Sequence, residues 1–152
     1  MKSVRGFTLI ELMVTVAILA IIATMAAPSF STMLINQRLN SDTRNLMSML
    51  SQARSQAAFS RQDVTVQLLN QSSTSSGIFS FKPGNGVRLS PTTLSRGSVI
   101  FNSTGLVKTS TNKVITSDIT LTLCDSQSNF SKTITINFLG TLREGSIVGG
   151  CT

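Results

Sequence analysis

An acidic side chain stands inside an apolar run near the start of this sequence. Residues 8–27 read TLIELMVTVAILAIIATMAA, and Glu11 is the one charged residue among them. A charged side chain at the centre of a membrane helix costs on the order of 2.5–3.5 kcal/mol, and less near the interface. The position of Glu11 therefore requires a partner that offsets this cost.

A cut in the backbone between Gly6 and Phe7 would create such a partner. The cut would give Phe7 a free α-amino group, which is largely protonated near neutral pH. Glu11 lies four residues further along, on the same face of a helix that begins here. Its carboxylate can then neutralise this amine, or the amine of a neighbouring copy packed alongside. The spacing predicts an ion pair that forms only after processing.

The element that positions Glu11 is a helix of membrane length. About 20 residues of α-helix span about 30 Å, the thickness of a bilayer's hydrocarbon core. A secretory signal peptide is one alternative, with small residues from Ala23 to Ala27 near its cut, but its apolar core is usually about 7–15 residues. An ordinary signal anchor is the other, and it has no use for Glu11. We therefore predict a leader over residues 1–6 and a transmembrane helix over residues 7–28.

Beyond Pro28 the helical pattern becomes amphipathic. Proline removes a helical hydrogen bond, so we expect a bend at this residue. The helix is predicted to continue over residues 29–61, because Thr43 and several other residues recur at spacings of three, four and seven. The other members of this face are Leu39, Leu46, Met47, Leu50, Ala53, Arg54 and Ala57. We expect this face to pack onto the remainder of the chain.

Residues 62–152 are predicted to form a β-rich domain. Apolar and polar residues alternate strictly in ITLTL (119–123) and TITIN (133–137), as they do in half-buried strands, and residues 125–129 between them indicate a hairpin. Residues 72–77 and 102–105 are predicted turns. The strand candidates are 64–68, 78–82, 86–89, 98–102, 105–108, 113–124 and 132–139. The predicted class is α+β: a long N-terminal helix packed on a C-terminal antiparallel β-sheet domain.

The composition argues against most enzymatic chemistry. The 152 residues include no histidine and six carboxylates, which excludes histidine triads and histidine metal sites. Neither a P-loop nor a Gly-x-Gly-x-x-Gly motif is present, and residues 84–86 are typical of a turn. We expect no enzyme activity, no cofactor and no metal. The formal net charge of +7 favours anionic surfaces without naming one.

The segment Gly6-Phe7-Thr8-Leu9-Ile10-Glu11 resembles the processing site of type IV pilins and type II secretion pseudopilins. The resemblance implies that a prepilin peptidase cuts after Gly6 and methylates the new N-terminus at Phe7. It implies that Glu11 guides assembly by pairing with a neighbour's N-terminus, and it matches the family's helix-softening proline to Pro28. The expected location is the inner membrane, single-pass with a periplasmic domain, and then a filament of other pilins or pseudopilins.

The domain resembles the GspH/FimT type of minor pilins and pseudopilins, through VIFNSTGLV (99–107) and ITINFLGTLREG (134–145). The periplasm is oxidising, so we expect one disulfide between Cys124 and Cys151, the two cysteines of the chain. It would pin the glycine-rich tail GSIVGGC to the sheet. Two free thiols or a metal pair are the alternatives, and neither has a supporting site.

Three roles follow from the resemblance. The first is a subunit that primes or caps a type IV pilus, the second a type II secretion pseudopilin, and the third a DNA-binding pilin for natural transformation. DNA-binding members carry Gly-Arg-x-Arg at the C-terminal turn, but here Gly140-Thr141-Leu142-Arg143 lacks the first arginine and Glu144 follows. Affinity scales with the phosphates neutralised, so the third role is disfavoured. Its candidate contacts are Lys108, Lys113, Lys132 and Arg143.

Overall fold

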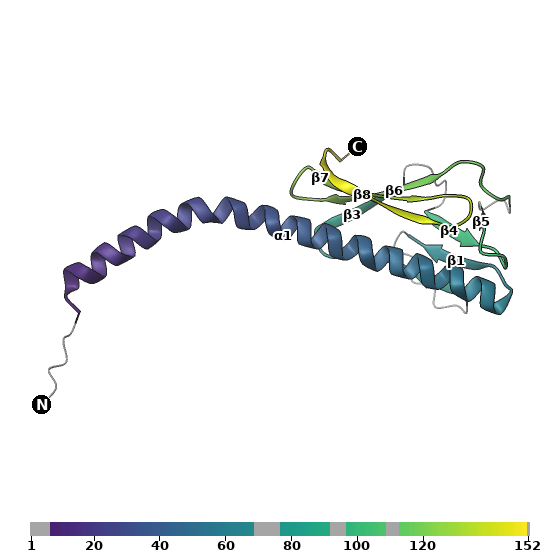
Figure 1. Cartoon of the computed structure of the whole chain (residues 1–152), viewed down its shortest axis with the longest axis horizontal. Helices are drawn as coiled ribbons and strands as arrows, with labels where there is room; N and C mark the ends of the chain where they lie inside the picture. The colour runs from purple at the N-terminus through teal and green to yellow at the C-terminus, as the bar shows by residue number, and fades with distance from the viewer. Residues whose placement is uncertain (1–6, 69–76, 92–96, 109–112, 152) are drawn as a thin grey trace, which may run out of the picture. The chain divides into compact units, whose positions relative to one another are not determined.

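The computed structural model of this chain describes residues 7–68, 77–91, 97–108 and 113–151, with the backbone alone for residues 25–29 and 91 (Figure 1). Two compact units are present, Met1–Leu34 and Ile35–Thr152. One helix, α1 (Leu9–Ser60), supplies residues to both units. The predicted α+β class with a long N-terminal helix is confirmed.

The first unit is an apolar part of α1. Its large apolar side chains between Leu9 and Ile22 are 50% to 77% exposed. Within the residues that the structure describes, no helix has both the length and the apolar character needed to cross a membrane. Pro28 lies inside α1, and the bend expected there stays a prediction.

The second unit begins with the amphipathic part of α1. Its buried face steps along the helix by three or four residues, as the sequence pattern predicted. The fully buried members are Leu39, Thr43, Leu46, Leu50, Ala53 and Ala57. The hydroxyl of Thr43 donates to the carbonyl oxygen of Leu39 at 2.6 Å, so this buried polar group is satisfied. Arg61 ends the helix with a φ of 53°, the left-handed conformation common just after a helix C-terminus.

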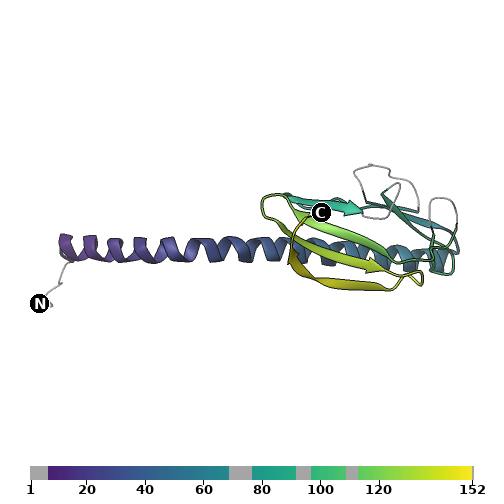
Figure 2. The ribbon, with the colours of Figure 1, turned by 90° about the horizontal axis from the view of Figure 1, so that it is seen from above.

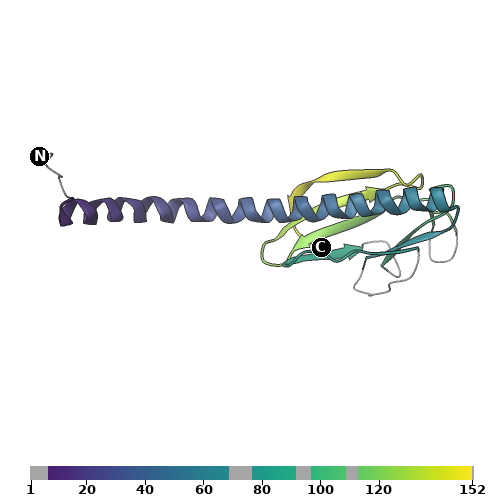
Figure 3. The ribbon, with the colours of Figure 1, turned by 90° about the horizontal axis from the view of Figure 1, so that it is seen from below.

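Within the residues that the structure describes, two four-stranded sheets pack against this part of α1. The first sheet has the order β2-β1-β4-β5, with β1 Val64–Gln67, β2 Ile78–Ser80, β4 Ser98–Phe101 and β5 Val107–Lys108. The second sheet has the order β3-β6-β7-β8, with β3 Val87–Pro91, β6 Ile119–Asp125, β7 Phe130–Ile136 and β8 Leu142–Gly149. The strands lie in front of the helix in Figure 2 and behind it in Figure 3, so the sheets cover one side of it.

One hydrophobic core joins the helix to both sheets. Alternate residues of the strands point into it, such as Val64 and Val66 of β1 and Leu121 and Leu123 of β6. Each such side chain contributes roughly 1.5–3 kcal/mol when fully buried. The alternation of apolar and polar residues that predicted β6 and β7 therefore matches the alternation of buried and less buried side chains in these strands. The predicted hairpin between β6 and β7 is confirmed.

Three details differ from the predictions. The pair β1 and β2 is parallel, whereas antiparallel sheets were expected. The predicted strand 113–124 begins only at Ile119. Strand β8 replaces the predicted glycine-rich tail and pairs with β7 through a register shift beside Lys132 and Ile134. Gly145 lies at this irregularity, where a Cβ would overlap the hydroxyl of Thr133. Glycine lowers strand propensity, but the close approach of the Thr133 side chain leaves no room for a Cβ at this position.

Two turns with the same hydrogen bonds face each other in this unit. The Oδ1 of Asn102 accepts from the N–H of Leu106 at 2.8 Å, and the Oδ1 of Asn137 accepts from the N–H of Thr141 at 2.8 Å. Their glycines, Gly105 and Gly140, have φ values of 78° and 74°. A Cβ on Gly140 would lie 2.8 Å from the carbonyl oxygen of Gly105. Both turns therefore require glycine, and the predicted turn at 102–105 is confirmed.

Candidate functional site

The N-terminal candidate site begins with a capped helix. The N–H of Glu11 donates to the hydroxyl oxygen of Thr8 at 3.3 Å, and the N–H of Leu12 donates to the carbonyl oxygen of Thr8 at 3.2 Å. Thr8 and Glu11 stand at the two ends of a Thr-x-x-Glu pattern, which is the sequence signature of a capping box. Thr8 was not among the predicted site residues, although this signal was present. With Thr8 as the cap, the helix begins at Leu9, and Phe7 lies before it.

Phe7 and Glu11 are both exposed in this structure. Phe7 is 81% exposed, and Gly6 lies outside the described residues. A carboxylate in the first helical turn gains about 0.3–1 kcal/mol from the partial positive charge of the helix N-terminus. The predicted pairing of Glu11 with an amine stays a prediction.

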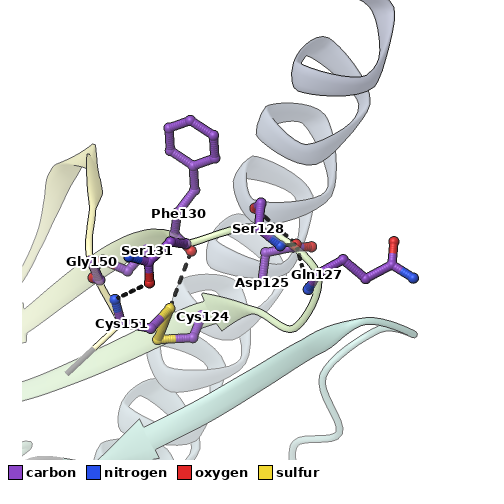
Figure 4. The surroundings of a disulfide bond; sticks show 9 residues. Cys124, Asp125, Gln127, Ser128, Phe130, Ser131, Gly150 and Cys151 are labelled. Carbon is purple, nitrogen blue, oxygen red and sulfur yellow. Dashed lines mark hydrogen bonds between the residues drawn. A yellow bond between two sulfur atoms is a disulfide. The ribbon is translucent and has the colours of Figure 1, made fainter. Parts of the chain in front are cut away.

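A disulfide ties the C-terminal end of the chain to β6 (Figure 4). The predicted pairing of Cys124 with Cys151 is confirmed, and their Cα atoms lie 5.7 Å apart, inside the usual range for a disulfide. The N–H of Cys151 donates to Asn129 Oδ1 at 3.1 Å, and the hydroxyl of Ser131 donates to the carbonyl oxygen of Gly150 at 2.7 Å. The chain end is therefore fixed to the β6–β7 hairpin by both covalent and hydrogen bonds.

Asp125 organises the same hairpin (Figure 4). Its Oδ1 accepts from the N–H of Gln127 at 3.0 Å, and from the N–H and hydroxyl of Ser128 at 2.7 and 2.9 Å. Burial alone would raise the pKa of Asp125, but these hydrogen bonds and the charge of Arg38 outweigh it, so its pKa lies below its ordinary value. The ionised form of Asp125 therefore stabilises the turn.

Replacing Asp125 with Asn is expected to lower the free energy of unfolding at pH 7 by about 1–2 kcal/mol, because the hydrogen bonds lose their charge. A carboxyl whose pKa is lower in the folded state contributes stability above its unfolded pKa, and this contribution is lost as the pH falls through the folded value. The variant should therefore lose less stability than the parent below about pH 4. Urea unfolding between neutral and acidic pH measures both effects. The exposed Asp118→Asn is the control, and equal acid slopes for Asp125→Asn and the parent would refute this role.

Lys132 is a structural residue rather than a free surface cation. It is 7% exposed, its ammonium donates to Asn40 Oδ1, and it forms an ion pair with Glu144. The hydrogen bond from Lys132 holds the pKa of Glu144 below its ordinary value. These contacts join α1, β7 and β8. The structure thus corrects the prediction that Lys132 contacts nucleic acid, because its charge is buried and already paired.

The other predicted nucleic-acid contacts do not join Lys132 in one basic patch. Lys108 lies on β5, in the other sheet, with its ammonium 3.0 Å from a carboxylate oxygen of Asp63. Arg143 is exposed and pairs with Thr135, which faces away from the buried side of β7 that holds Lys132. Lys113 is exposed just before the bridge between Val114 and Lys108.

Known protein families and a solved structure resemble this chain in sequence and in fold. Residues 1–27 match the prokaryotic N-terminal methylation motif, and residues 42–140 match the family of the type II transport protein GspH. The fold is similar to the crystal structure of the type IV minor pilin FimU of Pseudomonas aeruginosa, with a TM-score of 0.54 and 17% identity over 72% of this chain and 90% of that one. No curated protein matches the chain. Because the GspH match spans well over half of its length, the protein belongs to the GspH family, within the type IV pilins and type II secretion pseudopilins.

Proposed function

We propose that this protein is a structural subunit, not an enzyme, that primes or caps a type IV pilus. The observation that carries the proposal is the first part of α1, whose large apolar side chains from Leu9 to Ile22 are at least half exposed beside the single charge of Glu11. A helix that is apolar on all sides is stable only in lipid or among other apolar helices. A filament core built from such helices supplies these surroundings.

The precursor first resides in the inner membrane as a single-pass protein. Lys2 and Arg5 stay in the cytoplasm by the positive-inside tendency, and residues 62–152 lie in the periplasm. The disulfide between Cys124 and Cys151 supports the periplasmic placement, because such bonds persist in oxidising compartments.

Processing then prepares the chain for assembly. A prepilin peptidase cuts after Gly6 and methylates the amine of Phe7, in keeping with the methylation motif over residues 1–27. The capped helix start leaves Phe7 outside the helix, where its amine is accessible to the carboxylate of a neighbouring Glu11. Other pilins are the partners of this step.

A second candidate function is a pseudopilin of a type II secretion system. The description of the matching family, type II transport protein, favours this secretion role. The fold similarity to the type IV minor pilin FimU is in keeping with the pilus role. A role in DNA uptake is the third candidate. The burial of Lys132 weakens the DNA-uptake role further, because Lys132 was one of the four residues proposed to contact DNA.

A deletion strain separates the first two functions. We expect deletion to reduce surface pili strongly, with an unchanged profile of secreted proteins, and we expect the wild-type gene to restore the pili. Electron microscopy and immunoblots of sheared pili measure the first outcome, and gel analysis of the culture medium measures the second. Normal piliation together with lost secretion would reject the pilus role in favour of the secretion pseudopilus.

A further inference from the structure

A groove of about 590 Å³ lies in the second unit, where the end of α1 meets β2. Its volume is within the range of about 300–1,000 Å³ that is typical of ligand sites. Four lining residues, at positions 52, 55, 56 and 59, recur along α1 at the spacings that place side chains on one helix face. The complete lining is Ser51, Gln52, Ser55, Gln56, Phe59 and Phe79.

Two phenylalanines give the groove its apolar surface. Phe79 of β2 is partly buried and packs against the hydrophobic core, so its ring has a fixed place. Phe59 is 88% exposed near the end of α1. A single exposed apolar side chain is ordinary on a protein surface. Here, however, the exposed ring lines the same groove as the anchored ring of Phe79.

The remaining lining residues offer uncharged hydrogen-bonding groups. Gln52 donates through Nε2 to the hydroxyl oxygen of Ser48 at 3.2 Å, which leaves its Oε1 able to accept. The hydroxyl of Ser55 donates to the carbonyl oxygen of Ser51 at 3.0 Å, which leaves the lone pairs of this hydroxyl. Within the described part of the chain, the side chains of Ser51 and Gln56 make no hydrogen bond to protein. The groove therefore presents both donors and acceptors to a ligand.

The charge of the lining restricts the ligand. Among the described residues, no Lys, Arg, Asp or Glu contributes to the groove. An ionic ligand would lose hydration here without meeting an opposite charge. Nucleic acid fits poorly, because its affinity depends on cations that neutralise phosphates. A matching ligand is neutral, carries many hydroxyl groups and has one flat apolar face.

We propose that this groove binds a neutral saccharide of the β-linked glucose type. In such a sugar the hydroxyl groups surround the ring, and the C–H groups form an apolar face. That face stacks on the exposed ring of Phe59, and the hydroxyls bond with Gln52 and Gln56, since each hydroxyl can both donate and accept. The proposal goes beyond the filament role and does not depend on Glu11.

The test uses the full-length processed protein in phosphatidylcholine nanodiscs, which contain no sugar, unlike maltoside detergents. The probe is cellotriose, observed by saturation-transfer difference NMR, because the chain has no Trp or Tyr whose fluorescence could report binding. We expect saturable binding, with the strongest transfer at the C–H protons of the ring face. Phe59→Ala should weaken binding at least about fivefold, because it removes the stacking surface.

Matched variants separate stacking from a general loss of apolar surface. Phe138→Ala removes another phenylalanine, 46% exposed in the turn between β7 and β8, and should leave affinity within about twofold. Gln56→Leu removes an amide of similar size and should weaken binding about threefold to tenfold. Phe59→Leu keeps an apolar side chain without the ring, and it replaces Phe59→Ala if circular dichroism shows that the latter is unfolded.

Three results would overturn the proposal. The first is the absence of saturation transfer to cellotriose at concentrations up to about 10 mM. The second is an affinity that Phe59→Ala and Phe138→Ala change equally. The third is stronger binding of a single-stranded hexathymidine oligonucleotide with the same sensitivity to Phe59→Ala, which would identify the groove as a base-stacking site.

Discussion

Replacing Glu11 with Ala is expected to lower the amount of this protein in sheared filaments at least about tenfold, while cleavage after Gly6 continues. The reason is that an amine left without its carboxylate in an apolar core costs roughly 3–5 kcal/mol. The cleavage site lies five residues before Glu11, so the peptidase substrate is largely preserved. Immunoblots of filament and membrane fractions measure incorporation, and the mobility of the membrane form measures processing.

Two control variants isolate the charge of Glu11. Glu11→Asp keeps a carboxylate and should retain part of the incorporation. Thr15→Ala lies one turn further along, where the hydroxyl donates only to the carbonyl oxygen of Leu12, and should incorporate normally. Normal incorporation of Glu11→Ala would show that the carboxylate has no role in assembly.

Removal of the disulfide should have the largest effect on the stability of the domain. The bond joins residues 27 apart in sequence, and the chain-entropy relation for a loop of this length gives about 3–4 kcal/mol. The double variant Cys124→Ser/Cys151→Ser should lose that much free energy of unfolding in urea. Reduction of the parent with dithiothreitol should produce the same loss, which serves as the control.

A smaller loss would identify the hydrogen bonds as the main attachment of the chain end. Two hydrogen bonds persist when the sulfurs are removed: the one from the Ser131 hydroxyl to the carbonyl oxygen of Gly150, and the one from the N–H of residue 151 to Asn129 Oδ1. If the double variant unfolds within about 1 kcal/mol of the parent, these bonds hold the end without the disulfide.

The sequence was informative wherever one local pattern controlled the outcome. The spacing of Leu39, Leu46 and Leu50 predicted the buried face of α1, because the helical period alone decides which residues share a face. The two cysteines allowed a single pairing within the chain. The turns at Gly105 and Gly140 carry their own signal, since each needs a left-handed φ.

Features that depend on pairing between distant segments were not predictable in this way. Strand β8 contains Gly145, which reads as a turn residue until the close approach of Thr133 is known. The parallel pairing of β1 with β2 depends on how the chain crosses between them. Lys132 looked like a surface cation because nothing in the sequence aligns it with Glu144 across a register shift.

The most direct test of the account is mass spectrometry of the N-terminus of protein recovered from filaments. We expect a chain that begins at a methylated Phe7, because the cut after Gly6 supplies the amine that pairs with Glu11 and the methylation motif covers this site. A filament subunit that still begins at Met1 would contradict it. A chain that begins at Pro28 would instead identify a plain secreted domain without a filament helix.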